Sequence, residues 1–333
     1  MSRAAALLTL ALAGRAAAAG IDVPPRGTLT LPSGPTTGPL RLHGGARIRA
    51  APGAVLSAPD GKVVVASEGE ENEIVGLSVR ARGEQSGIQL RGGSLALREV
   101  RVAAERGSAI LVSEGRLSAR GIAIDGGDYG VLAYRGEVDL EGGSIERVRR
   151  AGVALVRTTG RIARMRLVGP FGDAALSALA SPKLSLERNE IAAAGSIGIK
   201  ILSSTATLAH DRVAGAKADA RGLEGDGLYL FQSEVSSSGD RIEGSGGNGV
   251  VVLGGRAAIR DCVIERSGDA AAWVDERGRL SLTRCAVRGA ALGLHVEPGS
   301  EGTAPGTTFR ELREVPPEPR TGRNQSPPAP VER

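Results

Sequence analysis

The sequence predicts an all-β repeat protein, and three observations predict it: a repeat of about 22 residues, alternation of apolar residues within each repeat, and an excess of glycine. The chain has 333 residues, of which 49 are glycine, whereas its aromatic residues are three Phe, three Tyr and one Trp. Apolar residues make up 41% of the chain, which is enough to bury a core. That core must be built from Val, Ile, Leu and Ala.

The repeat covers most of the chain. Each copy begins with a small residue followed by alternating apolar residues, as in Gly87–Leu90 and Gly249–Val252. A second half reads apolar-x-apolar-x-x-small or polar-x-apolar, as in Leu184–Ile191. Both halves alternate with period two, which predicts strands with one buried face, and glycines between them supply positive φ for turns. The expected starts are Gly87, Ala109, Gly130, Gly152, Ala174, Gly198, Gly227, Gly249 and, less clearly, Ala270 and Ala291.

A coil of about 22 residues made of short strands and glycine turns resembles the right-handed parallel β-helix of the pectin lyase-like superfamily. The resemblance implies a single-stranded solenoid of about 11–12 coils, stacked about 4.8 Å apart around columns of like side chains. A leucine-rich repeat is the alternative, since its period is similar and Leu184–Ile191 matches its strand motif. The recurring Gly-apolar-x-apolar pattern, where that family places a helix, favours the β-helix.

The domain organisation follows from where the repeat begins and ends. We expect a lead-in at residues 20–39, the β-helix at 40–300 and a C-terminal cap at 301–315. Residues 316–333 contain six prolines and no apolar run, which predicts a disordered tail.

The N-terminal segment, residues 1–19, has the pattern of an export signal. A short cationic start, Met1 to Arg3, precedes an apolar run at residues 4–14, and Ala17 to Ala19 offer small residues for cleavage. The run is shorter than a membrane span, so a cleaved signal peptide is favoured over an anchor. We therefore expect a bacterial periplasmic or extracellular protein with no transmembrane segment after cleavage.

Charge argues against a nucleic-acid partner. The chain has 42 Lys and Arg against 37 Asp and Glu, and the two signs are interleaved without a basic block or a row of stacking aromatics. We therefore expect the partner to be a glycan or a protein.

Two cysteines, Cys262 and Cys285, occupy the same position of consecutive coils, so their side chains are expected to be stacked in the interior. Adjacent parallel strands place Cα atoms within disulfide range, and export implies an oxidising compartment. Stacked side chains point in parallel rather than toward each other, which favours two buried thiols, and a disulfide stays the alternative. We expect no zinc site, because two thiolates without a nearby histidine supply half a ligand shell.

Acidic and amide residues precede several repeat starts. Asp226, Asn248 and Asp269 fall in consecutive coils, where they could align as an oxygen-rich column for calcium. Such residues also close tight turns through bonds to the backbone, and this interpretation is favoured. We therefore expect no cofactor, with calcium as the alternative.

One coil is longer than the others, and its extra residues include Lys217 and Arg221. Beside it, Tyr229 should point outward, and Trp273 does the same if its repeat starts at Ala271 rather than Ala270. Leu111, Leu132 and Val251 share that outward column. This stripe either stacks on sugar rings or receives a partner protein, or the insertion folds over it.

Two functions follow. The favoured one is a non-catalytic binding or structural module of the cell envelope that contacts a glycan or a protein through Tyr229, Trp273 and Asn248. The alternative, implied by the resemblance, is a polysaccharide lyase, hydrolase or epimerase acting on acidic glycans. Its candidate catalytic residues are Asp226, Asp269, Lys217 and Arg221. Scarce aromatics and the missing Gly-His-Gly and Asp-Pro-His-Glu patterns of such enzymes favour the first function.

Overall fold

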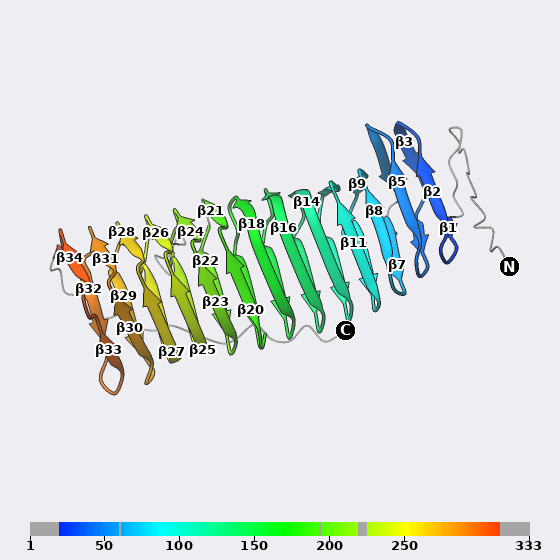
Figure 1. The fold of residues 1–333 in the computed structure, drawn as a ribbon. Helices are drawn as coiled ribbons and strands as arrows, with labels where there is room; N and C mark the ends of the chain where they lie inside the picture. The colour runs from blue at the N-terminus through cyan, green and yellow to red at the C-terminus, as the bar shows by residue number, and fades with distance from the viewer. Residues whose placement is uncertain (1–19, 60, 193–194, 219–224, 314–333) are drawn as a thin grey trace.

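The computed structural model describes residues 20–59, 61–192, 195–218 and 225–313, and it is a parallel β-solenoid (Figure 1). In these ranges, thirty-four strands, β1 to β34, stack in about 13 turns of about 22 residues each. The described residues contain no helix, and therefore none that could cross a membrane. The all-β solenoid is confirmed, with slightly more coils than the 11–12 expected.

Each coil contributes to three faces, and the strands of a face pair in parallel with those of the coils before and after. Face 1 consists of β1 (Ile21–Val23), β4 (Leu40–Leu42), β7 (Val65–Glu68), β10 (Ile88–Arg91), β13 (Ser108–Ser113), β15 (Tyr129–Tyr134), β17 (Ala151–Val156), β19 (Ala174–Leu179), β22 (Ile197–Leu202), β25 (Leu228–Ser238), β27 (Val250–Arg260), β29 (Ala270–Asp275) and β32 (Leu292–Val296).

Face 2 begins with the strands β2 (Thr28–Leu31), β5 (Arg47–Ala50), β8 (Asn72–Val75), β11 (Ser94–Arg98), β14 (Arg116–Gly126), β16 (Glu137–Glu146) and β18 (Thr159–Val168). It continues with β20 (Leu184–Glu187), β23 (Thr205–Ala209), the later halves of β25 and β27, β30 (Arg279–Thr283) and β33 (Glu301–Thr303).

Face 3 consists of β3 (Gly34–Thr37), β6 (Ala54–Ser57), β9 (Ser78–Ala81), β12 (Arg101–Ala104), the later halves of β14, β16 and β18, β21 (Glu190–Ala192), β24 (Arg212–Ala214), β26 (Arg241–Glu243), β28 (Val263–Glu265), β31 (Ala286–Arg288) and β34 (Thr308–Arg310). Five of the described strands thus run through a corner from one face to the next.

The core is made of columns of similar apolar side chains. Along face 1, for example, Ile88 pairs with Ile110, which pairs with Val131, and all three are fully buried. The small residue at each repeat start is required by crowding where the chain enters face 1. A Cβ atom on Gly249 would lie 2.5 Å from Cγ2 of Ile264 and 2.6 Å from the carbonyl oxygen of Ala271.

The solenoid extends beyond the expected boundaries. Residues 20–39, expected as a lead-in, form the first coil with β1 to β3, and β33 and β34 complete the last coil within the expected cap. The register also moves three repeat starts later, to Ala175, Ala271 and Gly293 in place of Ala174, Ala270 and Ala291. The predicted signal peptide and the Pro-rich tail lie outside the described residues.

The corner between faces 2 and 3, which we call the second corner, contains a residue in the left-handed region. In several coils this residue is charged, such as Glu99 (φ +55°) and Arg188 (φ +54°). The residue after each of them points inward. In the later coils these inward residues are polar, and we call them the second-corner ladder: Asn189, Asp211, Asp240, Cys262, Cys285 and Thr307.

Members of the second-corner ladder accept hydrogen bonds from the coil before. The backbone N–H of Met165 donates to Asn189 Oδ1 (3.0 Å), that of Asn189 to Asp211 Oδ1 (2.7 Å), and that of Asp211 to Asp240 Oδ1 (2.6 Å). Farther along, the N–H of Cys285 donates to Thr307 Oγ1 (3.1 Å). Buried backbone N–H groups that make no hydrogen bond to a neighbouring strand find an acceptor in this way.

The corner between faces 1 and 2, the first corner, has a ladder of hydroxyl groups: Thr158, Ser181, Ser204 and Ser233. The backbone N–H of Ser181 donates to Ser204 Oγ (2.9 Å), and that of Ser204 donates to Ser233 Oγ (3.2 Å). Each hydroxyl in turn donates to the carbonyl two residues earlier, as Ser204 does to Leu202 (2.7 Å).

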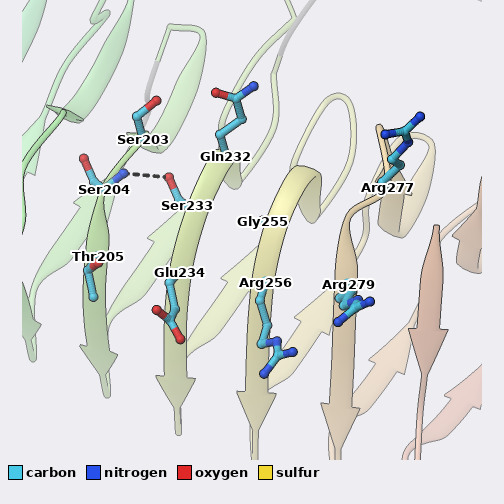
Figure 2. Close-up of a pocket in the computed structure, with 10 residues that line it drawn as sticks. All are labelled: Ser203, Ser204, Thr205, Gln232, Ser233, Glu234, Gly255, Arg256, Arg277 and Arg279. Carbon is cyan, nitrogen blue, oxygen red and sulfur yellow. Dashed lines mark hydrogen bonds between the residues drawn. The ribbon is translucent and has the colours of Figure 1, made fainter. Parts of the chain in front are cut away.

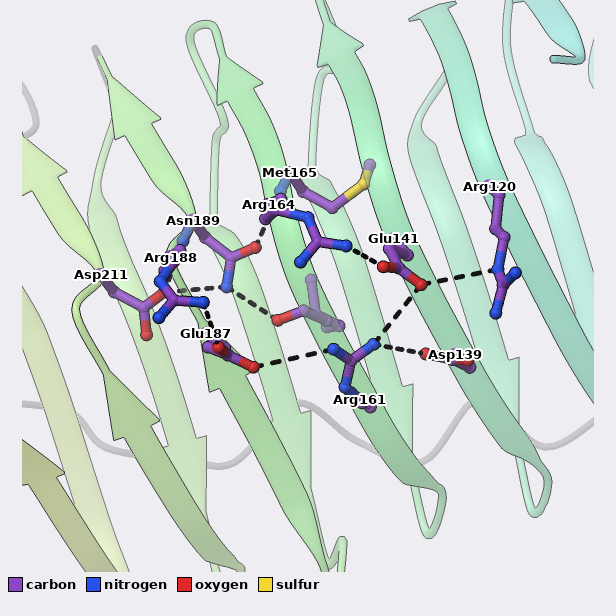
Figure 3. A network of polar contacts seen from close by, with 11 residues as sticks. Arg120, Asp139, Glu141, Arg161, Arg164, Met165, Glu187, Arg188, Asn189 and Asp211 are labelled. Carbon is purple, nitrogen blue, oxygen red and sulfur yellow. Dashed lines mark hydrogen bonds and ion pairs between the residues drawn. The ribbon is translucent and has the colours of Figure 1, made fainter. Parts of the chain in front are cut away.

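The outer surfaces of faces 2 and 3 are covered by charges that pair between coils. Figure 3 shows Arg161 on face 2 between Asp139 (3.3 Å), Glu141 (3.8 Å) and Glu187 (3.7 Å). On face 3, Glu265 is 3% exposed and contacts Arg241 at 2.8 Å. The exposed pairs contribute little each, and together with partly buried ones such as Glu265 they leave these two faces highly charged.

Candidate functional site: the outer surface of face 1

The outer surface of face 1 differs from the other two in composition. The side chains that point away from the core form two columns along the rod, and register defines both. Not all of them are exposed, since Val251 and Leu253 are buried, at 0% and 1%. The first column is Leu111, Leu132, Ala154, Ser177, Lys200, Tyr229, Val251, Trp273 and His295. The second, two residues later, is Ser113, Tyr134, Val156, Leu179, Leu202, Phe231, Leu253 and Asp275. We call these two columns the face 1 strip.

Aromatic residues are concentrated at the strip. Five of the seven in the chain lie on or beside it: Tyr129, Tyr134, Tyr229, Phe231 and Trp273. Of the other two, Phe171 is fully buried in the core and Phe309 belongs to the last coil. The register places Trp273 beside Val251, so it belongs to the same column as Tyr229.

An apolar cluster separate from the core occupies the middle of the strip. Leu132, Ala151 and Ala154 are buried there, and Tyr129 and Tyr134 pack against them. The guanidinium of Arg150 lies 5.4 Å from the centre of the Tyr129 ring, within cation–π range. Burial and the neighbouring Tyr129 raise the pKa of Tyr134 despite Arg150, so its hydroxyl stays protonated at neutral pH.

The end of the strip has a stacked ring pair. The rings of Trp273 and His295 have centroids 4.1 Å apart and an interplanar angle of 27°. His295 Nε2 also lies 3.1 Å from Glu297 Oε1, which fixes the imidazole orientation. The two rings together form a larger flat surface than the indole alone.

A lysine stands next to Tyr229 in the first column. Lys200 Nζ lies 2.7 Å from Asp173 Oδ1, and the lysine side chain is 15% exposed. Its backbone pairs with Tyr229 in the following coil. The strip thus places an amine, already paired with a carboxylate, beside a phenol.

Toward the N-terminal end, the first column continues into a groove. Arg41 pairs with Ala66, and Ala66 with Gln89, which precedes Leu111 in the column. These residues and Lys62 line a groove of about 690 Å³. Asp22 and Glu68 also line this groove, so the surface changes from charges of both signs in the early coils to apolar and aromatic residues in the later ones.

A second groove, of about 490 Å³, lies at the first corner rather than on the strip (Figure 2). Three arginines line it, Arg256, Arg277 and Arg279, together with Glu234 and the hydroxyls of the first-corner ladder. Ser204 and Ser233 direct those hydroxyls to backbone carbonyls, so they are occupied by the fold.

The structure separates the acidic residues that the sequence grouped. Asp226 and Asn248 are in contact: the backbone N–H and Nδ2 of Asn248 donate to Asp226 Oδ1 at 2.7 and 3.0 Å. Asn248 Oδ1 accepts the N–H of Ala270. The next residue of this column is therefore Ala270, and Asp269 lies one position before it, outside the column. These contacts join consecutive coils, 22 residues apart, rather than close a turn within one coil. Among the described residues, no group of three or more His, Cys, Asp or Glu is placed to hold a metal.

The long coil enters the site region between β24 and β25. Its extra length lies between Ile199 and Leu228, which pair with each other in register. Lys217 is exposed on it, whereas Arg221 lies outside the described residues. The two cysteines lie away from the strip, inside the second corner, and both side chains are buried.

Sequence reasoning missed Lys200, Asp173 and His295 as members of this surface. The separation of Trp273 and His295 by one repeat would have indicated that their rings stack. The contact of Lys200 with Asp173 has no such signal, because it joins a strand residue to a turn residue of the coil before.

Comparisons with known proteins give matches at the level of structure. No protein-family model matches the sequence, and no curated protein matches it. A crystal structure of the periplasmic alginate epimerase AlgG matches with a TM-score of 0.63 and 12% identity, covering 85% of this chain and 77% of that one. The GH136 lacto-N-biosidase from Eubacterium ramulus matches with a TM-score of 0.50 and 10% identity, covering 88% of this chain and 63% of that one. At these identities, the likeness establishes that the chain shares the parallel β-helix fold of these proteins.

Proposed function

We propose that this chain is an exported protein that binds a polysaccharide of the cell envelope along the face 1 strip without altering it chemically. The observation that carries the proposal is the concentration of five of seven aromatic residues on this surface. Aromatic rings offer flat apolar surfaces with polar edges, which suit sugar rings. Faces 2 and 3 present paired charges instead.

The dimensions of the strip suit an extended polymer. Tyr129 is in the sixth strand of face 1 and Trp273 in the twelfth. Six coil spacings of about 4.8 Å separate them by about 29 Å along the rod. A chain of several sugars would contact rings at both ends of this distance, and the groove around Arg41 and Lys62 would extend the contact.

The matched structures support a polysaccharide as the ligand. One is described as a periplasmic alginate epimerase and another as a lacto-N-biosidase, so both act on glycans. We also propose that the chain belongs to the pectin lyase-like superfamily and that its coils are right-handed. Its proposed location is periplasmic or extracellular. The export-signal pattern of residues 1–19 supports the location.

The second candidate function is an epimerase or lyase for acidic glycans, and the pairing of Lys200 with Tyr229 favours it. Such chemistry needs a base to remove a proton from the carbon beside a carboxylate and a cation to stabilise the charge that develops. Tyr229 and Lys200 would take these roles, with Asp173 positioning the amine. We favour binding because the Lys200 amine already pairs with Asp173 at 2.7 Å, which lowers its capacity to neutralise a second carboxylate.

Ring substitutions test the binding proposal. Trp273→Ala should weaken binding to the preferred polysaccharide at least tenfold, because the stacking surface is lost, whereas Trp273→Phe keeps a ring and should lose less than threefold. Affinity electrophoresis or calorimetry against a panel of acidic and neutral polysaccharides would measure this. Equal losses for the two variants, or no binding to any polymer by the parent chain, would contradict the proposal.

Tyr229→Phe separates the two candidate functions, because it keeps the ring and removes the hydroxyl. A binding module should retain its affinity and produce neither unsaturated ends nor changed stereochemistry by NMR, before or after the substitution. Turnover by the parent chain that disappears in Tyr229→Phe would establish the enzyme and refute the non-catalytic proposal.

A further inference from the structure

The two cysteines occupy consecutive positions of the second-corner ladder. Each follows a residue in the left-handed region, Asp261 (φ +54°) before Cys262 and Arg284 (φ +53°) before Cys285. The side chains are 1% and 2% exposed. The N–H of Ala286 donates to the carbonyl of Cys262 at 2.9 Å, so the two backbones are bonded next to the thiols.

The thiols themselves are in contact. Their mutual interaction lowers the pKa of Cys285 and raises that of Cys262, while the Cys262 thiol donates to the carbonyl of Arg260 at 3.1 Å. Parallel strands about 4.8 Å apart also keep the Cα atoms of paired residues within the range that a disulfide accepts. The ladder position and the backbone bond between the two coils thus place the two cysteines within the Cα separation that a disulfide accepts.

A contact between the two cysteines of this chain would seldom arise at random. The chain has two cysteines in 333 residues. A fully buried residue touches about 6–12 others, so two randomly placed residues would touch in only about 3% of cases. Other ladder positions accept the neighbouring N–H with oxygen, as Asp211 and Thr307 do, and sulfur is the weaker acceptor. Hydrogen bonding alone therefore does not account for sulfur at both positions.

We propose that Cys262 and Cys285 are oxidised to a disulfide that joins coil eleven to coil twelve. The two thiols lose two protons and two electrons as the S–S bond forms, and the electrons reduce the disulfide of a protein oxidant or of glutathione disulfide to two thiols. Because both sulfur atoms are buried in the folded chain, exchange takes place as the two coils dock, before the corner closes.

The bridge would act on the proposed binding surface. It closes a ring of chain from Cys262 to Cys285, and this ring contains β29 with Trp273. The disulfide therefore constrains the coil that carries the indole, which lies on the opposite side of the core from the second corner. The disulfide could form whether or not the strip binds a glycan.

The test is to refold the full chain in a glutathione redox buffer and count its thiols in denaturant. We expect no thiol to react with a maleimide before reduction and two after it, with an intact mass lower by two hydrogens in the oxidised form. Peptide mapping should find Cys262 and Cys285 joined within one chain. Two reactive thiols before reduction, or a bridge only between two chains, would overturn the proposal.

Cys285→Ser is the matched control, because Thr307 already places a hydroxyl in the next position of the ladder. Reduction should lower the thermal midpoint of the parent chain and leave that of Cys285→Ser unchanged. If the bridge is mapped but the thermal midpoint of the parent chain does not change on reduction, the proposal that the disulfide stabilises these coils is refuted.

Discussion

Asp211 is an acid in a ladder position where the coil before it has an amide, Asn189. Its Oδ1 accepts the backbone N–H and Nδ2 of Asn189 at 2.7 and 2.8 Å, whereas Oδ2 has no hydrogen-bond partner in the described part of the chain. The side chain is 1% exposed. Burial raises the pKa of Asp211 from 3.8 to about 7, and Asp240 nearby adds to the shift.

This shift predicts the pH dependence of stability. Because the folded-state pKa lies above that of the unfolded chain, the unfolded state releases its proton first as the pH rises. The free energy of unfolding should therefore fall between about pH 4 and pH 7, by at most about 4 kcal/mol from this group, and change little above that range. Asp211→Asn should remove most of the fall and stabilise the protein at pH 8, as measured by urea unfolding at pH 5 and pH 8.

Asn189→Asp provides the opposite control, since it places a second carboxyl against Asp211. It should lower the free energy of unfolding strongly at pH 8 and by less at pH 5. If Asp211→Asn were as pH-sensitive as the parent chain, the raised pKa would have to be assigned to another group. Asp240, whose pKa is also raised by burial, would be the first to examine.

At the residue scale, the sequence predicted side chains that repeat in register and missed those that depend on the coil before. The stacked cysteines and the contact of Asp226 with Asn248 one coil later follow from spacing alone. Lys200 in β22 reaches Asp173, a turn residue 27 positions earlier, and nothing in a one-dimensional pattern indicates that pair.

At the scale of elements, alternation predicted the strands because one side of every strand is buried. Register was harder where two small residues stand together. Ala174 and Ala175, like Ala270 and Ala271, are equally suited to the crowded repeat start, and only the pairing of neighbouring strands selects the second. The first corner was also misjudged, because the backbone there requires positive φ but leaves the side chain in water, as at Glu114, Arg135 and Arg157. Arginine or glutamate is then tolerated in place of glycine.

The first-corner ladder gives a prediction for one element. Ser204→Ala removes the acceptor for the N–H of Ser181 and leaves that buried donor unsatisfied. It should lower the free energy of unfolding by about 1–2 kcal/mol. Ser236→Ala on the exposed side of β25 is the matched control and should change stability by less than about 0.5 kcal/mol in the same denaturant titration.

Equal effects of Ser204→Ala and Ser236→Ala would mean that water or a backbone shift satisfies the Ser181 N–H. That result would remove the ladder as a source of stability and leave strand pairing alone to hold the first corner.

For the whole molecule, the period predicted the fold, but the number of coils was underestimated. The pairings of the first coils have irregular spacings: Ile21 pairs with Leu40, which pairs with Val65, so the first coil is shorter than the usual repeat and the second is longer. A search for a constant period does not recognise such coils. The aromatic strip was also only partly predicted, because it depends on the register of seven coils at once.

The ends of the rod should be its least stable part. Val296 and Phe309 are the large hydrophobic residues exposed in the described chain, at 36% and 37%. Both continue interior columns, behind Val274 and Val287, and are exposed because the last described coil has a neighbour on one side only. Coils contact only their neighbours, so stability is a sum of local terms.

Hydrogen exchange should therefore show a gradient along the rod. Amides of the terminal coils, in β1 to β3 and β32 to β34, should exchange before those of β14, β16 and β18, whose long strands pair on both sides. Mass spectrometry of peptic fragments would measure this order. Uniform exchange of all coils would instead indicate a single cooperative unit.

The direction of the two corner ladders bears on how the chain matures. At both corners, a side chain of one coil accepts the N–H of the coil before it. A chain that crosses a membrane N-terminus first therefore always has a newest coil whose corner donors await a segment still on the other side. Folding is then vectorial, with each arriving coil completing its predecessor, and an arrested chain would end in unsatisfied donors at its growing tip.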